Sequence, residues 1–404
     1  MKRRHRMGER LIICLPDVIV LLAASSIILS VKYYRVLFKR SALKKYKQQY
    51  SPRMSIFIPC KGSDQQFERN IQHFLRAGYQ KAKVFFIVES RKDEAYALIR
   101  QQIKRCPNAY LVVAGRSKYC GQKNYNLLQG INASEEQDEV YVFLDAHTII
   151  SARQVQELIL PLSDANVTAA VGFRWNILQE KTFGERLHAF MVALQWGAIH
   201  CFWLNPVWGG ATAIKREHFE KMGVRDYWAK TVVDDMTLQQ MIQKQGRKAV
   251  FVPSCVMETD HTIKDVKSAV QWFKRQTLYV KFYLRPLWLG MLALLLYAAV
   301  HVVGLPFLLA YAAIYPSKKL AFFAGMKATF TLLTMLFALL LKRPGDEKNS
   351  ALFWFVFSPL YLLLSAWAGF LGLFTRVIGW KDIAYRLDYH GIVKEIQRDR
   401  SYAV

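Results

Sequence analysis

Residues 139–148 read EVYVFLDAHT, in which five apolar residues end at Asp145 and His147 follows closely. Similar apolar runs occur earlier in the chain, at 54–60 (MSIFIPC), 83–90 (KVFFIVES) and 109–115 (AYLVVAG). Stretches of helical character separate them, at 65–77, 93–104 and 122–129. This alternation is typical of βαβ units in a mostly parallel sheet. The sequence therefore predicts an α/β domain whose ligand lies over the carboxyl ends of the strands, where Asp145 stands.

The composition of the 404-residue chain excludes a disordered protein, because 53% of its residues are apolar and 14% are aromatic. Of the net charge of +26, 11 charges come from residues 1–53, which hold 13 lysines and arginines against Glu9 and Asp17. These cations flank one apolar segment, a pattern that suits anionic lipid headgroups better than nucleic acid. Six scattered cysteines without metal-ligand spacing predict reduced, mostly buried thiols.

Four segments are apolar and long enough to enter a bilayer. The first, residues 11–31, follows a basic start, so a cleaved signal peptide is its main rival. No small-residue cleavage site follows it, which favours an uncleaved anchor helix. The other three lie near the carboxyl end, at 286–315, 320–341 and 351–374. The sequence thus predicts a multi-pass membrane protein with a cytoplasmic α/β domain.

The number of crossings near the carboxyl end is ambiguous. If each of the three segments crosses once, the basic tail lies opposite the α/β domain, against the positive-inside tendency. Residues 286–315 could instead form two passes or a re-entrant hairpin, or residues 11–31 could lie at the interface. We expect an even number of C-terminal crossings.

Several short motifs occur in a specific order within residues 50–285: FIPCKG, VESRKDEAYALIRQQIKRCPN, GQKNYNL, FLDAHT, GGATAIKREHF, VVDDMTL and WFKRQ. Together they resemble the membrane-bound inverting glycosyltransferases of family 2. The similarity is greatest to the ceramide glucosyltransferase-like group, which includes bacterial hopanoid-type glycosyltransferases. A pattern at 380–387, WKDIAYRL, also recurs after the last membrane segment of similar proteins.

The resemblance implies a glycosyltransferase A-type nucleotide-sugar-binding fold with transmembrane helices on both sides of it. The expected parts are a basic N-terminus with an anchor helix (1–32), the catalytic domain (33–263), an interfacial helix (264–285), transmembrane helices (286–375) and a basic tail (376–404). The expected reaction is the inverting transfer of one sugar from a nucleotide sugar, with UDP as the expected nucleotide, to a membrane lipid hydroxyl.

Asp145 and His147 are the predicted metal ligands. A divalent cation held by a carboxylate can neutralise charge that develops on a diphosphate leaving group. The family has an Asp-x-Asp-like motif here, whereas this chain has His147 at the second acidic position. The expected cofactor is Mn²⁺ or Mg²⁺. Imidazole binds Mn²⁺ better than Mg²⁺, so whether His147 is a ligand depends on which cation is bound. The competing interpretation is a helix cap at Asp145 and simple packing of His147.

Asp234 and Asp235 precede a predicted helix and are the candidate catalytic acids. Inverting transfer needs a base for the acceptor hydroxyl, and crowding of two carboxylates raises one pKa. By resemblance, Asp235 matches the catalytic Asp of the family. Two acids that favour the dipole of a helix N-terminus are the structural alternative.

The candidate substrate-binding residues lie in turns and near the last motif. The predicted nucleotide pocket contains Pro59, Lys61, Gly62, Glu89, Asp93, Lys123 and Asn124. The turn at Gly210 would line the acceptor side, by resemblance. Processive family members carry Gln-x-x-Arg-Trp near Trp272, but Gln271 replaces the Arg here, and Arg275 is the candidate for contact with the diphosphate.

Two other functions compete with single-sugar transfer. A processive polysaccharide synthase belongs to the same class, and the incomplete Gln-x-x-Arg-Trp pattern and few membrane passes disfavour it. A non-catalytic membrane adaptor with a decayed nucleotide-sugar fold is favoured by His147 but disfavoured by the joint presence of Asp145, Asp234 and Asp235.

Overall fold

The computed structural model describes residues 46, 49–63, 65–76, 81–199, 206–259, 263–341 and 348–398. The predicted anchor at 11–31 lies outside the described residues. A seven-stranded sheet has the order β3-β2-β1-β4-β6-β5-β7. Its strands are β1 (Met54–Cys60), β2 (Ala82–Val88), β3 (Ala109–Val113), β4 (Val140–Leu144), β5 (Ala169–Asn176), β6 (Ala211–Lys215) and β7 (Ala249–Thr259).

The sheet is mostly parallel, as the sequence predicted. β1 pairs in parallel with β2 and β4, β2 with β3, and β5 with β7, whereas β6 runs antiparallel to β4 and β5. The strand order reverses between β1 and β4, since the chain adds β2 and β3 on one side and returns to the other. A crevice for a ligand forms at such a reversal, at the carboxyl ends of the strands.

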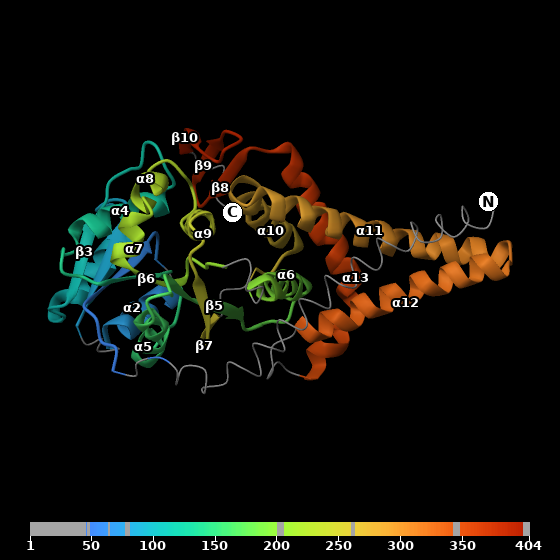
Figure 1. The fold of residues 1–404 in the computed structure, drawn as a ribbon, viewed down its shortest axis with the longest axis horizontal. Coiled ribbons are helices and arrows are strands. Elements are labelled where there is room, and N and C mark those ends of the chain that lie inside the picture. The colour runs from blue at the N-terminus through green and yellow to red at the C-terminus, as the bar shows by residue number, and fades with distance from the viewer. Residues whose placement is uncertain are drawn as a thin grey trace.

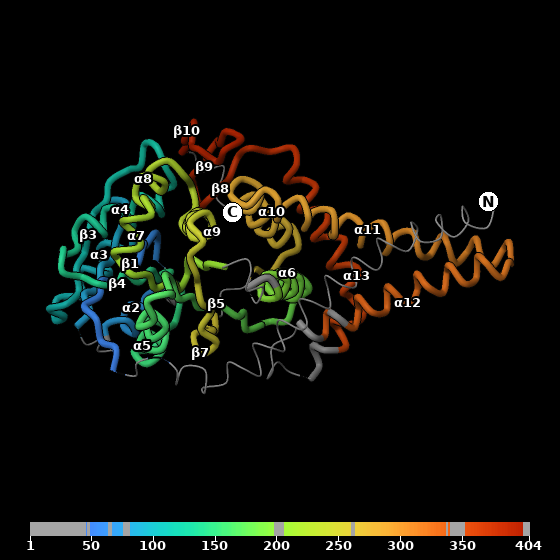
Figure 2. The backbone as a smooth tube through the Cα atoms, in the orientation of Figure 1, coloured from blue at the N-terminus to red at the C-terminus, as the bar shows by residue number. Residues whose placement is uncertain are grey.

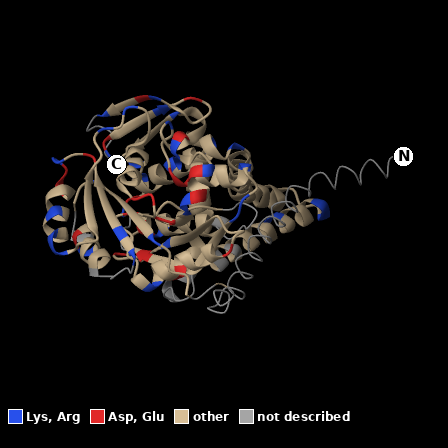
Figure 3. Ribbon diagram, turned by 60° about the vertical axis from the view of Figure 1, so that its left-hand side comes forward, with Lys and Arg blue, Asp and Glu red and all other residues tan. Residues whose placement is uncertain are grey.

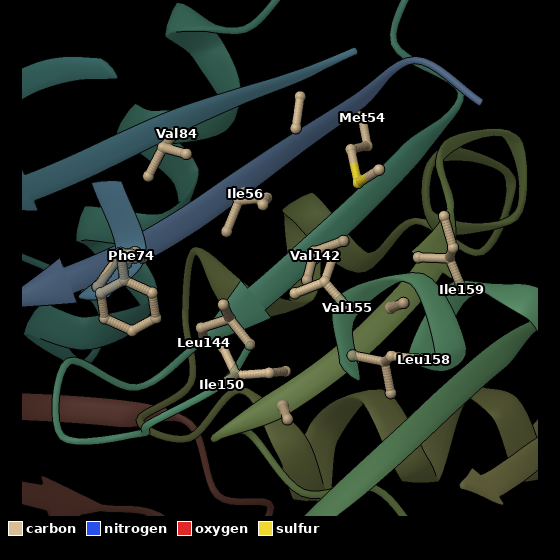
Figure 4. Close-up of a cluster of buried hydrophobic side chains, with 14 of the residues drawn as sticks. Met54, Ile56, Phe74, Val84, Val142, Leu144, Ile150, Val155, Leu158 and Ile159 are labelled. Carbon is tan, nitrogen blue, oxygen red and sulfur yellow. The ribbon is translucent and has the colours of Figure 1, made fainter. Parts of the chain in front are cut away.

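Helices cover both faces of the sheet (Figure 1). They are α2 (Gln65–Arg76), α3 (Glu94–Gln102), α4 (Gln122–Ala133), α5 (Ala152–Ile159), α6 (Phe183–Ile199), α7 (Arg216–Lys221), α8 (Val224–Trp228), α9 (Asp235–Lys244) and α10 (Val266–Tyr283). Successive residues of β1 point to opposite faces, so Ile56 and Ile58 pack with α2, α3 and α5 while Phe57 packs with α4, α8 and α9. Figure 4 shows the first of these clusters around Ile56, Val142 and Leu144. Burial on both faces explains why the strands read as continuous apolar runs.

A third cluster joins β5, α6 and α10 to the helices that follow. Phe190 and Trp196 of α6 are buried in it, with exposed fractions of 1% and 6%. α6 contacts β5, α10 and two of the long apolar helices that follow, so its aromatic side chains fill a protein interior.

In the part of the chain that the structure describes, three helices are long and apolar enough to cross a membrane, as predicted. They are α11 (Arg285–Ile314), α12 (Lys318–Leu341) and α13 (Lys348–Leu371). α11 is one continuous helix despite Pro306, so the interpretation of 286–315 as two passes or a re-entrant hairpin is wrong. α11 and α12 form a long hairpin that extends away from the sheet, and α13 runs across its base (Figures 1 and 2). Apart from Lys318 and Lys319 at its tip, the hairpin has few charged residues along its length (Figure 3).

The chain ends in a small antiparallel sheet that returns to the α/β domain. Its strands are β8 (Val377–Trp380), β9 (Ile383–Leu387) and β10 (Val393–Arg398), in the order β10-β9-β8. Ile378, Ile383 and Tyr385 pack against Phe282 and Tyr283 of α10. The sheet therefore belongs to the globular part of the molecule, beside α9 and α10 (Figure 1).

Candidate active site

A lysine joins the acids that the sequence singled out. Nζ of Lys123, near the start of α4, lies 2.9 Å from Oδ1 of Asp145 and 3.0 Å from Oδ2 of Asp234. Asp145 follows β4, and Asp234 and Asp235 begin α9, so residues far apart in sequence meet at the carboxyl edge of the sheet. Asp234 is buried, with an exposed fraction of 3%. Buried charges of opposite sign at this distance hold one another in place.

Two glycines allow this close approach. The backbone N–H of Gly209 donates a hydrogen bond to Oδ2 of Asp235 at 3.1 Å. A Cβ at position 209 would lie 2.5 Å from Oδ2 of Asp234 and 2.9 Å from Nζ of Lys123. At Gly121 a Cβ would lie 2.3 Å from the backbone oxygen of Val232, so this glycine lets the start of α4 reach the segment before α9. Gly209 precedes Gly210 in the turn that the sequence singled out, but its contact with Asp235 depends on the fold.

The surroundings of Asp235 favour its protonated form. Burial raises the pKa of its carboxyl to about 7, and the adjacent Asp234 adds to the shift. Lys123 and the N–H groups of Gly209 and Met236 oppose it. Burial alone would lower the pKa of Lys123, but the three carboxylates raise it overall and keep the ammonium charged. A carboxyl that titrates near neutral pH is suited to general-base catalysis.

One cavity of about 1330 Å³ contains the cluster. Nine of the predicted site residues line it: Pro59, Lys61, Lys123, Asp145, His147, Asp234, Asp235, Trp272 and Arg275. Asp145 and Asp235 thus face the same space, as a shared reaction site requires. Another part of the cavity is mostly apolar, with walls from the three long apolar helices: Leu294, Leu295 and Ala298 of α11, Thr334 and Ala338 of α12, and Leu362 of α13.

The other predicted residues have structural contacts outside the lining of this cavity. Asp93 caps α3, accepting hydrogen bonds from the N–H groups of Ala95 at 3.0 Å and of Gly62 at 2.9 Å. Asn124 is fully buried and donates to the backbone oxygen of Thr231 at 3.1 Å. These two side chains hold the loops that carry the site.

Gly210 and Glu89 also lie behind the cavity wall. The backbone oxygen of Gly210 accepts hydrogen bonds from the N–H of Asp145 at 3.2 Å and from the hydroxyl of Thr148 at 3.1 Å. Glu89 is buried at the end of β2 and forms an ion pair with Lys61 at 3.4 Å. Gly210 therefore fixes the backbone of Asp145, and Glu89 fixes Lys61.

A second group of cations lies beside Trp272. The guanidinium of Arg174, on β5, is 5.6 Å from the centre of the Trp272 ring, and the ring of His188 packs edge-on against Trp272 at 4.5 Å. Arg174 lines the cavity near Asp145 and Arg275, and burial lowers its pKa, an effect that Asp145 opposes. Sequence reasoning missed Arg174, because an arginine inside an apolar strand carries no motif.

The donor set at Asp145 fits a cation that is bound together with a ligand. Among the residues that the structure describes, no group of three or more histidine, cysteine or acidic side chains could hold a metal ion. Asp145 and His147, one carboxylate and one imidazole, both line the cavity. Two protein ligands are enough where phosphate oxygens and water complete the coordination, as in many Mg²⁺ and Mn²⁺ sites with nucleotides.

The sequence profile of glycosyl transferase family 21 matches residues 18–393. The chain belongs to this family. The match extends from the predicted anchor to the C-terminal sheet, so the membrane helices and the tail are part of the family pattern. The chain is therefore a glycosyltransferase, and the alternative of a non-catalytic adaptor loses its basis. No curated protein sequence matches the chain significantly.

One solved structure confirms the fold. A mannosyltransferase from Pyrobaculum calidifontis, solved with GDP-mannose and Mn²⁺, is similar with a TM-score of 0.51 and 17% identity, over 88% of this chain and 97% of that chain. Glucosyl-3-phosphoglycerate synthase from Mycobacterium tuberculosis, solved with Mg²⁺ and UDP, has a TM-score of 0.39 and 12% identity, over 60% of this chain and 82% of that chain. The similarity to the mannosyltransferase, which was solved with a nucleotide sugar and Mn²⁺, supports the glycosyltransferase A-type fold of the α/β domain.

Proposed function

We propose that this glycosyltransferase transfers a single sugar, with inversion, from a nucleotide sugar to a hydroxyl group of a membrane lipid. The cavity carries the proposal, because it joins the acid and lysine cluster at the sheet to an apolar end between α11, α12 and α13. A charged donor fits the first end, and an acyl or isoprenoid chain fits the second. UDP is the nucleotide that we expect.

Asp235 is the proposed base. Its raised pKa means that the carboxylate can take a proton from the acceptor hydroxyl near neutral pH, while that oxygen attacks the anomeric carbon and the bond to the diphosphate breaks. Gly209 and Met236 orient the carboxylate through their N–H groups, at 3.1 and 2.7 Å. Asp234 keeps the pKa of Asp235 high and binds Lys123.

Cations around the cavity would hold the diphosphate. Three cations line the same space: Lys123 on α4, Arg174 on β5 and Arg275 on α10. All three are on helices or strands, which fix the position of their charge. Asp145 and His147 would hold Mn²⁺ or Mg²⁺, which supplies further charge neutralisation on the leaving group when it is bound. Lys123 can pass from Asp145 to a phosphate oxygen, because its ammonium is a point charge on a flexible stem that can pair with either anion.

The acceptor chain would lie between the membrane helices. Ala298 and Ala338 have small side chains where they face the cavity, and Leu294, Leu295 and Leu362 make the rest of that wall apolar. Each methylene of a lipid chain that leaves water in such a groove contributes about 0.8 kcal/mol. The chain therefore supplies binding free energy far from the reacting hydroxyl.

The C-terminal sheet constrains the topology. Because β8–β10 packs on α10 and on the segment before α9, we infer that it lies on the same side of the membrane as the α/β domain. We infer that α11 and α12 cross the membrane and that α13 lies along the boundary, which gives an even number of crossings. Burial within the protein supports this assignment. In the apolar part of each helix, 39% of the residues of α13 are buried, compared with 17% for α11 and 11% for α12.

Cysteine labelling tests this topology in intact cells. In a background without reactive cysteines, Ser317→Cys at the hairpin tip and Tyr389→Cys in the C-terminal sheet would be compared with a membrane-impermeant reagent. We expect labelling of position 317 from the side opposite to position 389. Labelling of both positions from one side would contradict the proposed hairpin.

The reaction itself is tested with the full-length enzyme in lipid nanodiscs. A panel of UDP- and GDP-sugars would be offered with a membrane lipid extract, and products would be identified by mass spectrometry. We expect lipids that carry one added hexose. A ladder of longer products would favour a processive synthase, and transfer to soluble acceptors alone would overturn the lipid assignment.

A further inference from the structure

The C-terminal sheet forms part of the cavity wall, separate from the cluster of Lys123, Asp145, Asp234 and Asp235. Gly379, Trp380 and Lys381 of the β8–β9 hairpin and Tyr385 of β9 line the cavity. Trp380 is half-buried, and the centre of its ring lies 5.7 Å from Nζ of Lys61. An aromatic ring from the tail is thus part of the wall next to the first strand of the sheet.

Charged contacts fix the sheet in this position. Arg398, in β10, donates one hydrogen bond to Oε1 of Glu89 and another to Oε1 of Gln122, each at 2.6 Å. Asp382 forms an ion pair with Lys61. Lys61 follows β1, Glu89 follows β2 and Gln122 begins α4. The tail is therefore bonded to three separate parts of the carboxyl edge of the sheet.

Tyrosine hydroxyls add two more connections. The hydroxyl of Tyr385 accepts a hydrogen bond from the backbone N–H of Gln122 at 3.0 Å. The hydroxyl of Tyr283 accepts from the N–H of Val232 at 3.1 Å and donates to the backbone oxygen of Gly391 at 2.9 Å. Buried hydrogen bonds of this kind specify one docking geometry, since each broken one leaves an unsatisfied polar group.

The position of these contacts along the sheet indicates which part of the donor they meet. Asp145 follows β4, Lys61 follows β1 and Glu89 follows β2, and these strands are consecutive neighbours. Adjacent strands are about 4.8 Å apart, so Glu89 lies roughly 10 Å along the edge from Asp145. If the diphosphate lies at Lys123 and Asp145, a nucleotide in an extended conformation along this edge would place its nucleoside near Lys61 and Trp380.

We propose that the C-terminal sheet completes the nucleoside end of the donor site, with Trp380 as the stacking surface for the base. The inference rests on the proposed nucleotide-sugar donor. Arg398 and Asp382 are positioning residues, which act through Glu89, Gln122 and Lys61. Stacking of a base on an aromatic side chain contributes about 1–3 kcal/mol, which corresponds to roughly 5- to 150-fold in affinity.

Binding of UDP, GDP and pyrophosphate to the full-length protein in nanodiscs with Mn²⁺ tests the role of Trp380. Trp380→Ala should weaken binding of the better nucleotide about tenfold or more and leave pyrophosphate binding unchanged, while Trp380→Phe should retain most of the affinity. Trp367→Ala is the matched control, because Trp367 on α13 is exposed and does not line the cavity.

Arg398 and Arg386 form a second matched pair on the same small sheet. Arg398→Ala should raise the KM for the donor with little change in kcat, and Arg398→Lys should be intermediate, because a lysine cannot bridge Glu89 and Gln122 in the same way. Arg386→Ala should have no effect, because its side chain is 70% exposed. Near-UV circular dichroism would verify that each variant is folded.

The outcomes separate this inference from the proposed function. Nucleotide binding that is equal in the wild type, Trp380→Ala and Arg398→Ala overturns the role of the sheet and leaves the donor assignment intact. Equal losses of nucleotide and pyrophosphate affinity in Trp380→Ala also overturn it, because stacking acts on the base alone. A wild-type protein that binds neither UDP nor GDP overturns the nucleotide donor and, with it, this inference.

Discussion

The two ends of the cavity are built in different ways. The polar end combines side chains that are far apart in the sequence, from Lys61 to Arg398. Charge-assisted hydrogen bonds hold them, and such bonds are strong only when donor and acceptor are well aligned. The apolar end consists of the inner faces of three helices, whose contacts are non-directional. Substitutions at the polar end should therefore act on chemistry and donor binding, and those at the apolar end on the lipid alone.

The largest expected effect belongs to Asp235→Asn. Loss of the proposed base should lower kcat by about 10²- to 10⁴-fold. The affinity for UDP should stay within a few fold, because the amide keeps the shape of the side chain. Transfer assays and calorimetry would measure both quantities, with Asp226→Asn, an exposed acid on α8, as the control. Full activity of Asp235→Asn would assign the base to another residue.

Filling the apolar end should give the next largest effect. Ala338→Trp would place a large ring in the proposed chain groove, and overpacking of this kind costs roughly 1–3 kcal/mol. We expect the KM for a long-chain lipid to rise about 5- to 100-fold while donor affinity is unchanged. Ala321→Trp, at an exposed position of the same helix, is the control. A matching loss of donor affinity would mean that the two ends are not separate.

The pH dependence of kcat/KM should show the titration of Asp235. Because the proposed base must be ionised, kcat/KM should rise about tenfold per pH unit below a pKa of about 7 and level off above it. A profile that is flat from pH 5 to 8 would contradict the assignment.

Stability should have the opposite pH dependence. The folded-state pKa of Asp235 is above its unfolded value of about 3.8, so the folded protein binds the proton more tightly. The contribution of the protonated carboxyl is complete below pH 4 and is lost as the pH rises through 7. Asp235→Asn should therefore raise the melting temperature at pH 8 more than at pH 4. Equal shifts at both pH values would argue against a neutral, buried Asp235.

The smallest expected effect concerns His147, the proposed second metal ligand. His147→Asp should shift the preference between cations, improving activity with Mg²⁺ by a few fold relative to Mn²⁺, because carboxylate oxygen suits Mg²⁺ better than imidazole does. Titration of activity with each cation, and of UDP binding with and without it, would measure the change. An unchanged ratio would show that His147 does not contact the cation.

Sequence reasoning located the parts of the site that belong to a strand end or a helix start. Asp145 follows an apolar run and Asp235 begins a helix, and both face the cavity. Asp93 has the same local pattern but caps α3, because a carboxylate before a helix can bind either its own backbone or a ligand. Only the three-dimensional position distinguishes these roles.

The sequence by itself determined the α/β domain, the three long apolar helices and the acids at the strand ends, since each depends on local hydrophobic periodicity. Tertiary structure decided that Lys123 joins Asp145 to Asp234, that Gly209 must lack a side chain, and that Arg398 reaches Glu89 across more than 300 residues of chain. Contacts of this kind depend on how strands and helices pack together. No local pattern of residues encodes that arrangement.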